Sequence, residues 1–235
     1  MKFLDDGPGM RDADSGDEAE VPTAQLEHDL AAAQQEMLEL PAGYQPTQKA
    51  IVQNRIAEIL IDLQRGEEAF DTAREAYDTF VAAEQWEDAA QSCNVMFLSE
   101  QPNALPALGQ GVWLAVTFPI DAELTVALLQ HIIDETPKDS DGAAVAAVTA
   151  CYVVDMRTEG KQRDNLALFT SHMLGTVARR HGDVSKQEQF DYWMEKLELT
   201  DPAKFLPRLR NVVDVLVQDE WWVDRDAIWA TLPDQ

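Results

Sequence analysis

The chain has 235 residues, of which 46% are hydrophobic, so it is long and apolar enough to fold around one large core or two small ones. Its 18 Lys and Arg residues against 43 Asp and Glu residues give a net charge of −25. A field of this sign repels nucleic acid and anionic lipid, because binding a polyanion requires dense local cations. We therefore expect a protein partner with a basic surface, and neither a nucleic-acid nor a membrane partner.

The start of the chain predicts a cytoplasmic protein with an acidic tail. No run approaches the roughly 18 consecutive apolar residues that a membrane helix needs. The opening MKFLDDGPGM places acids where a signal peptide would have its apolar run. Acids, glycines and prolines dominate the first 22 residues, so residues 1–22 are predicted to be a disordered acidic tail.

Helical periodicity begins at Thr23, a plausible N-cap for TAQLEHDLAAAQQEMLEL, which Pro41-Ala42-Gly43 ends. The clearest helix follows, with apolar residues on one stripe at positions 52, 56, 59, 60 and 63. EEAFDTAREAYDTFVAA and WEDAAQSCNVMFLSEQP come next, separated by only two residues. So short a connection predicts that these two helices form an antiparallel hairpin.

Beyond Pro102, the pattern of LPALGQGVWLAVTFP does not decide between helix and loop. Asp121 then caps a helix that Pro137 ends, and Ser140 or Asp141 begins an alanine-rich one. Further helices are expected at about 162–181, 185–198 and 202–218, with a short one from Asp224. Since no convincing strand pattern occurs, we predict an all-α domain over 23–235, with any looser division near 138–141.

The segment FVAAEQWEDAAQSCNVMFLSEQPN resembles the second half of a tetratricopeptide repeat. An aromatic residue, an acidic pair, an alanine and a closing proline occur in the family's order, here Trp86, Glu87, Asp88, Ala89 and Pro102. The family usually has glycine where this chain has Tyr77 and Glu84. The resemblance covers about residues 50–137 and implies stacked antiparallel helix pairs with a concave peptide-binding surface. An irregular helical bundle with small residues at its crossings would give a similar pattern, so both architectures stay open.

The family's peptide-carboxylate binders are Lys, Arg and Asn residues on the first helix of each pair. Arg55 and Arg74 are the candidates that this chain offers, and alone they do not complete that set.

Motifs for catalysis are weak throughout the sequence. Gly109-Gln110-Gly111 lacks the third glycine and preceding strand of a nucleotide-binding loop, and no GxSxG elbow occurs. Cys93 and Cys151 have apolar neighbours, which is typical of buried free thiols. His131 and Glu135 are four residues apart on one helix, but a carboxylate metal site needs a second matching pair. We therefore expect no metal and no cofactor.

The stretch DEWWVDRDAIW holds three of the six tryptophans, Trp221, Trp222 and Trp229. In a structural interpretation, the helix from Asp224 folds back over the apolar stripe of 202–218 and closes the core. In a docking interpretation, the three rings bind a partner, because tryptophan is enriched in interface hot spots. Both interpretations can hold for different rings.

These patterns predict a non-catalytic protein-binding module, acting as an adaptor or an assembly chaperone. Two alternatives remain at this point. One is an enzyme whose carboxylates and histidines come together only in space, and the other is an acidic mimic of nucleic acid.

Overall fold

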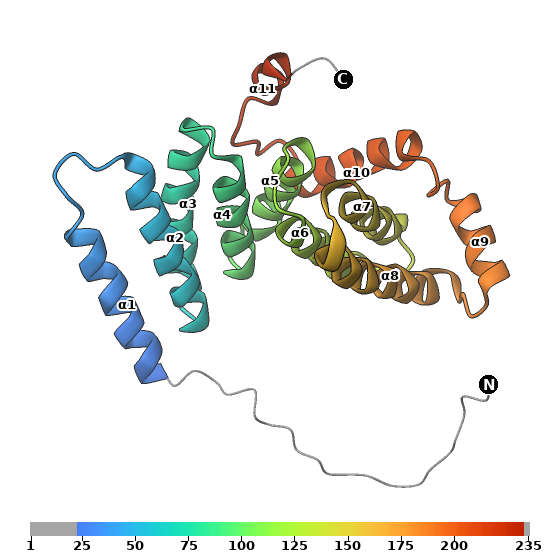
Figure 1. Cartoon of the computed structure of the whole chain (residues 1–235), viewed down its shortest axis with the longest axis horizontal. Helices are drawn as coiled ribbons and strands as arrows, with labels where there is room; N and C mark the ends of the chain where they lie inside the picture. The colour runs from blue at the N-terminus through green and yellow to red at the C-terminus, as the bar shows by residue number, and fades with distance from the viewer. Residues whose placement is uncertain (1–22, 233–235) are drawn as a thin grey trace, which may run out of the picture.

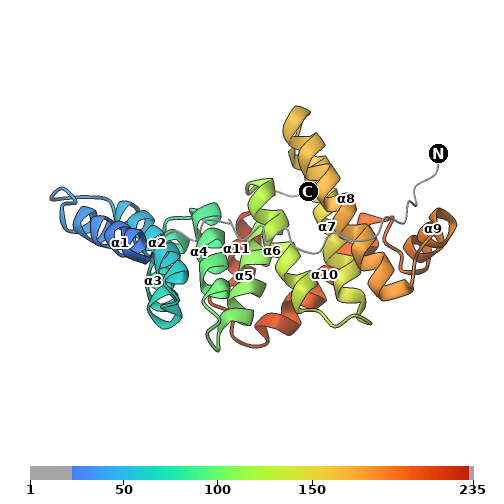
Figure 2. The ribbon, with the colours of Figure 1, turned by 90° about the horizontal axis from the view of Figure 1, so that it is seen from below.

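The chain advances along the long axis of the protein from its first helix to its ninth, and the tenth helix then runs back (Figures 1 and 2). The computed structural model describes residues 23–232, so the predicted acidic tail 1–22 lies outside the described residues. Within this range every regular element is a helix, which confirms the all-α class. The helices are α1 (Thr23–Leu38), α2 (Pro46–Asp62), α3 (Gly66–Ala82), α4 (Trp86–Leu98), α5 (Ala104–Thr117), α6 (Ala122–Glu135), α7 (Asp141–Arg157), α8 (Gly160–Gly182), α9 (Gln187–Lys196), α10 (Pro202–Val217) and α11 (Arg225–Thr231).

From α1 to α8 each helix packs against the next, as predicted for stacked antiparallel pairs. The connections from α2 to α5 turn at Gln64, Glu84 and Glu100, whose φ angles of 55–58° lie in the left-handed region. After Gln64 and Glu84 the amide of the following residue bonds back into the helix, Arg65 N to Leu60 O at 2.8 Å and Gln85 N to Phe80 O at 2.9 Å. Glu84 thus adopts the conformation that glycine takes most easily, at one of the two positions where the resembled family has glycine.

Helix α10 runs back along the molecule and packs across α5 and α7 (Figure 1). Its apolar stripe, Phe205, Leu209, Val213 and Val217, is fully buried there. In the structural interpretation of the tryptophans, the short final helix covers this stripe; instead α5 and α7 cover it, and no residue of α11 is buried. The physical reason is that α5 and α7 are rich in glycine and alanine, which lets α10 approach them closely.

Two glycines of α5 mark these close approaches. A Cβ atom at Gly109 would lie 2.5 Å from Cγ2 of Val217 on α10, and one at Gly111 would lie 2.7 Å from Cβ of Cys93 on α4. Real Cβ atoms do not come this near to other carbon atoms. Both glycines therefore serve helix packing, and the segment that the sequence pattern left undecided is a buried helix.

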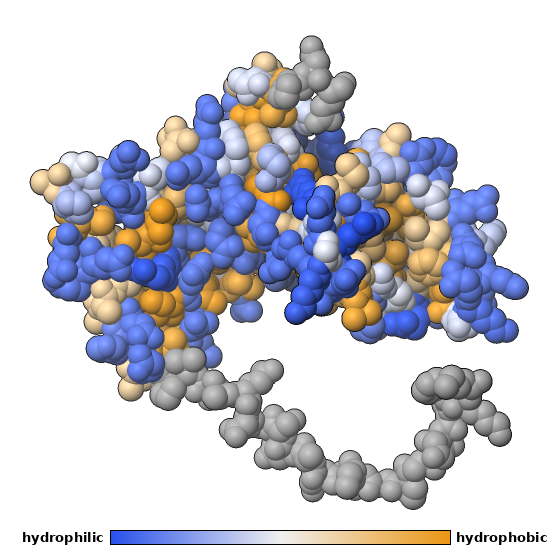
Figure 3. All heavy atoms as spheres, viewed as in Figure 1, coloured by the Kyte–Doolittle hydropathy of each residue, from blue (hydrophilic) through white to orange (hydrophobic). Residues whose placement is uncertain are grey.

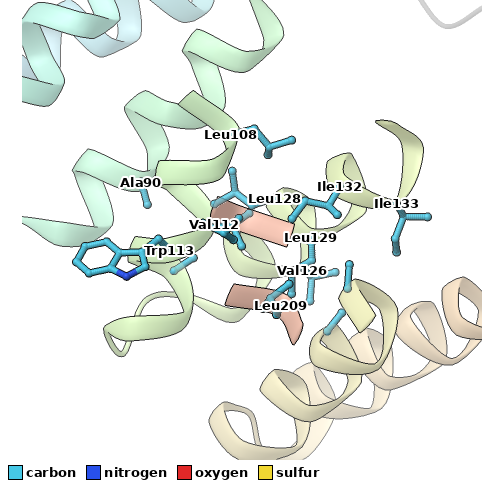
Figure 4. Close-up of a cluster of buried hydrophobic side chains, with 14 of the residues drawn as sticks. Ala90, Leu108, Val112, Trp113, Val126, Leu128, Leu129, Ile132, Ile133 and Leu209 are labelled. Carbon is cyan, nitrogen blue, oxygen red and sulfur yellow. The ribbon is translucent and has the colours of Figure 1, made fainter. Parts of the chain in front are cut away.

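One hydrophobic cluster extends from α2 to α10, and Figure 4 shows its centre, where α5 and α6 meet α10. A smaller cluster of six buried residues lies between α1, α2 and α3. The looser division considered near residues 138–141 falls where α6 is followed by α7, and these two helices pack against each other within the main cluster.

Cys93 is a buried free thiol as predicted, whereas Cys151 is a free thiol that is half-buried.

We expect Gly109→Ala to lower the free energy of unfolding by about 1–3 kcal/mol, because the added methyl group forces α5 and α10 apart. Urea titration followed by circular dichroism measures this. Gly175→Ala on α8 is the matched control: its Cβ would lie 3.6 Å from the Arg179 side chain and meet nothing closer. This variant should be unchanged, or more stable by up to about 1 kcal/mol. Equal stability of the two variants would show that α10 does not pack closely on α5.

A candidate protein-binding site at the C-terminal tryptophans

The chain from Gln218 to Asp224 crosses from α10 to the surface formed by α3 and α5, and a buried glutamine holds it there. Oε1 of Gln110, whose side chain is fully buried, accepts a hydrogen bond of 2.9 Å from the amide of Trp222. Its Nε2 donates to the carbonyl of Glu220 at a longer 3.4 Å. Because Gln110 bonds to main-chain atoms on both sides of Trp221, it fixes the register of the segment.

Trp221 packs edge-on against Trp113 of α5, with ring centroids 5.9 Å apart and an angle of 73° between the planes. The guanidinium of Arg225 lies 3.7 Å from the centroid of the Trp221 ring, within cation–π range. Arg225 also donates to Asp214 of α10 at 2.8 Å. The half-buried Trp221 ring therefore joins α5, α10 and the start of α11.

Trp222 points to α3 on the other side of the segment. Its ring meets Tyr77 edge-on at 5.4 Å, and the guanidinium of Arg74 lies 3.9 Å from its centroid. Arg74 also forms a salt bridge of 3.1 Å with Asp78. Two residues that were predicted as binding candidates for separate reasons, Arg74 and Trp222, are thus in direct contact.

Arg55 has a different environment. It forms a salt bridge with Glu36 of α1 on the exposed surface and does not reach the C-terminal segment. The structure therefore brings Arg74 into contact with Trp222, places Trp221 on the same segment and Trp229 on the helix that follows it, and leaves Arg55 apart.

Trp229 differs from its two neighbours because its side chain is 54% exposed. It lies on α11, which begins at the N-cap Asp224, whose carboxylate accepts a 3.0 Å hydrogen bond from Ala227 N. The base of α11 is held by half-buried apolar residues that pack on the main cluster, Val223, Ile228 and Leu232. Figure 1 shows α11 standing out from the row of helices, with apolar residues gathered at its base in Figure 3.

The electrostatic surroundings of Trp229 are acidic. Four exposed carboxylates lie within ten residues of it in the chain, Asp219, Glu220, Asp224 and Asp226. Arg225, four residues before Trp229, is held by Asp214 and by the Trp221 ring. The chain leading to Trp229 therefore carries more negative than positive charge.

The residues that sequence reasoning missed are those supporting the tryptophans, namely Gln110, Tyr77 and Trp113. In the sequence, Gln110 stands in Gly109-Gln110-Gly111, which lacks the features of a nucleotide-binding loop. A polar side chain inside a run as apolar as LPALGQGVWLAV was the available signal, since a buried amide requires hydrogen-bond partners.

The histidine candidate of α6 lies outside this site. Nε2 of His131 is 3.1 Å from Oδ1 of Asn94, and its ring is tilted against Phe97 at 4.6 Å. Burial lowers the pKa of His131, and the negative charges of Asp134 and Glu135 offset this only in part. Among residues 23–232, no three His, Cys, Asp or Glu side chains are grouped so that they could hold a metal ion.

Comparison of the chain with family models, curated protein sequences and solved structures gave no match. In the part of the chain that the structure describes, no helix has the length and apolar character needed to span a membrane.

We expect Gln110→Met to loosen the C-terminal segment while α5 stays helical. The variant leaves the Trp222 amide without its buried acceptor, a loss worth about 1–3 kcal/mol. Hydrogen–deuterium exchange should show faster exchange at residues 218–224 than in the parent protein. Gln130→Met on α6, which removes a surface bond to Asp134, is the matched control and should leave that exchange unchanged. Unaltered exchange in Gln110→Met would mean that Gln110 does not hold the segment.

His131 should make the protein less stable in mild acid. Its folded-state pKa is lower than its unfolded value, so the unfolded chain binds the proton more readily as pH falls through about 6.5. The free energy of unfolding should therefore drop between about pH 7.5 and about pH 5.5, and drop less in His131→Gln. Urea titrations at both pH values measure how much the free energy of unfolding changes with pH in the parent and in the variant. The same change in both proteins would contradict a lowered pKa at His131.

Proposed function

We propose that this protein is a non-catalytic protein-binding module, an adaptor or assembly chaperone in the cytoplasm, and that Trp229 is a main contact with its partner. One observation carries the proposal: Trp229 is largely exposed on a helix without a single buried residue. Exposing a large ring forgoes the stabilisation that its burial would give. Tryptophan placed in this way is typical of interface hot spots, where it supplies apolar area and an N–H donor.

The way in which α11 is attached supports this role. Gln110, Trp221 and Trp222 fix the preceding segment, so that α11 starts from a defined position on the body of the protein. A contact that is ordered before binding loses less conformational entropy when a partner arrives. In this proposal Trp221 and Trp222 take part mainly by positioning α11, and Arg74 acts by supporting Trp222.

The partner is proposed to be a protein with a basic surface. Exposed carboxylates accompany Trp229, and the whole chain carries a net charge of −25, which accelerates association with a positively charged protein. Stacked helix pairs and the tetratricopeptide resemblance of about residues 50–137 favour the same class of function. Arg55, paired with Glu36 on the surface of α1 and α2, stays a second candidate contact.

The test is to capture partners from the native cells with the intact chain, and then to measure the affinity of each purified partner for variants. Trp229→Ala should weaken binding at least about tenfold, as expected for a hot-spot ring, with an unchanged melting temperature. Tyr192→Ala on α9, which removes an aromatic ring that is 66% exposed, is the matched control and should bind as the parent does. A partner that binds Trp229→Ala as tightly as the parent, or the absence of any specific partner, would refute the proposal.

A further inference from the structure

A second surface feature lies at the other end of the helices from α11, where the connection from α4 to α5 meets the end of α6 (Figure 1). A pocket of about 390 Å³ opens there. Its size falls within the range of protein pockets that hold a small ligand or a few side chains. None of its lining residues belongs to the C-terminal aromatic segment, so this pocket is separate from the site proposed above.

The apolar part of the pocket is provided by two leucines. Leu98, the last residue of α4, and Leu105, in the first turn of α5, are 43% and 41% exposed. Phe97 and His131 also line the pocket, with their rings tilted against each other at 4.6 Å. Two exposed leucines that line one pocket provide a continuous apolar surface, and burying it would be favourable for a ligand.

The rim of the pocket is acidic. Glu100, Asp134 and Glu135 line it with exposed side chains, and no Lys or Arg does. Among the described residues, none of these three carboxylates forms a salt bridge, whereas seven other Asp and Glu residues have a cationic partner within 4.0 Å. Their negative charge is therefore available to a cation from outside.

Charge also decides between possible occupants. A second copy of this chain brings another net charge of −25, and the segment 1–22 carries seven acidic residues against two basic ones. Both would be repelled by the acidic rim. A basic partner segment is attracted by the same negative charge, and burying its apolar side chain against the two leucines is favourable.

We propose that this pocket binds a short segment of a partner protein in which an apolar side chain stands next to Lys or Arg. The apolar side chain lies against Leu98 and Leu105. The basic group lies among Glu100, Asp134 and Glu135. This interaction is independent of Trp229 and gives the protein a second site with a defined ligand chemistry.

The probe is a fluorescein-labelled peptide, Gly-Ser-Lys-Leu-Arg-Ser-Gly, with two comparison peptides in which Leu is replaced by Ser or both basic residues by Glu. Fluorescence anisotropy measures the binding of each peptide to the full chain at low ionic strength. The first peptide should bind at least about tenfold more tightly than either comparison peptide, because it alone supplies both the apolar and the basic contact. Absence of binding by the first peptide would overturn the proposal.

Two pocket variants locate the binding site. Leu98→Ser with Leu105→Ser should weaken binding about tenfold, whereas Leu168→Ser, at an exposed leucine of α8, should not. Glu100→Gln, Asp134→Asn and Glu135→Gln together should weaken binding at least about threefold. Their control is Glu188→Gln, Asp191→Asn and Glu195→Gln on α9, which removes the same charge from exposed positions.

Because all the substituted side chains are exposed, these variants should keep the circular dichroism spectrum of the parent. Equal weakening by the two triple variants would show attraction to the overall charge and overturn the pocket assignment. Full binding by the double leucine variant would overturn it as well. Trp229→Ala should bind the peptide as the parent does, so that the outcome is independent of the proposed function at α11.

Discussion

The fold depends on how closely α5 approaches its neighbours. Gly109 allows contact with Val217 of α10, and Gly111, two residues further on, allows contact with Cys93 of α4. Between these two glycines, the side chain of Gln110 is completely enclosed and bonds to the main chain of the C-terminal segment. Larger residues at either glycine would separate α5 from α4 or α10. Without these contacts, α10 would not return along the row of helices and would not bring Trp221 and Trp222 to α3 and α5.

This arrangement gives the row of helices two different surfaces. On one side, aromatic rings and Arg74 hold the segment that carries α11 and the exposed Trp229. At the other end of the helices, two exposed leucines and three carboxylates surround a pocket. Both surfaces combine apolar area with negative charge, and an excess of acids throughout the chain reinforces the field at each. A single class of partner, basic with exposed apolar side chains, fits both.

Much of the fold could be predicted because its signals are local. Asp121 and Ser140 accept hydrogen bonds from the first amides of α6 and α7, as their positions before apolar periodicity indicated. The two-residue connection at Glu84 and Gln85 correctly predicted a hairpin. The segment 105–119 could not be assigned, because glycine ordinarily indicates a turn, and here it serves the contact between helices. The tetratricopeptide resemblance of about residues 50–137 stays a prediction.

The site was predicted only in part, because its contacts join residues far apart in the chain. The three tryptophans and Arg74 were recognised individually, but their arrangement depends on Gln110, which bonds to a residue 112 positions away. Sequence periodicity reports which face of a helix is apolar and does not report which distant helix covers it. This is also why periodicity left open whether α11 covers α10, when α5 and α7 do so.

The most direct test of this account is to measure how accessible each tryptophan is to a soluble paramagnetic gadolinium chelate. The readout is the broadening of each indole ¹⁵N–¹H NMR signal, after these signals have been assigned to their residues. The structure predicts that Trp229 is broadened at the lowest chelate concentration, that Trp221 and Trp222 require more, and that the buried Trp113 and Trp193 are the most protected. Broadening of Trp221 and Trp222 together with Trp229 would contradict the account, because it would mean that the C-terminal segment is not held against α3 and α5.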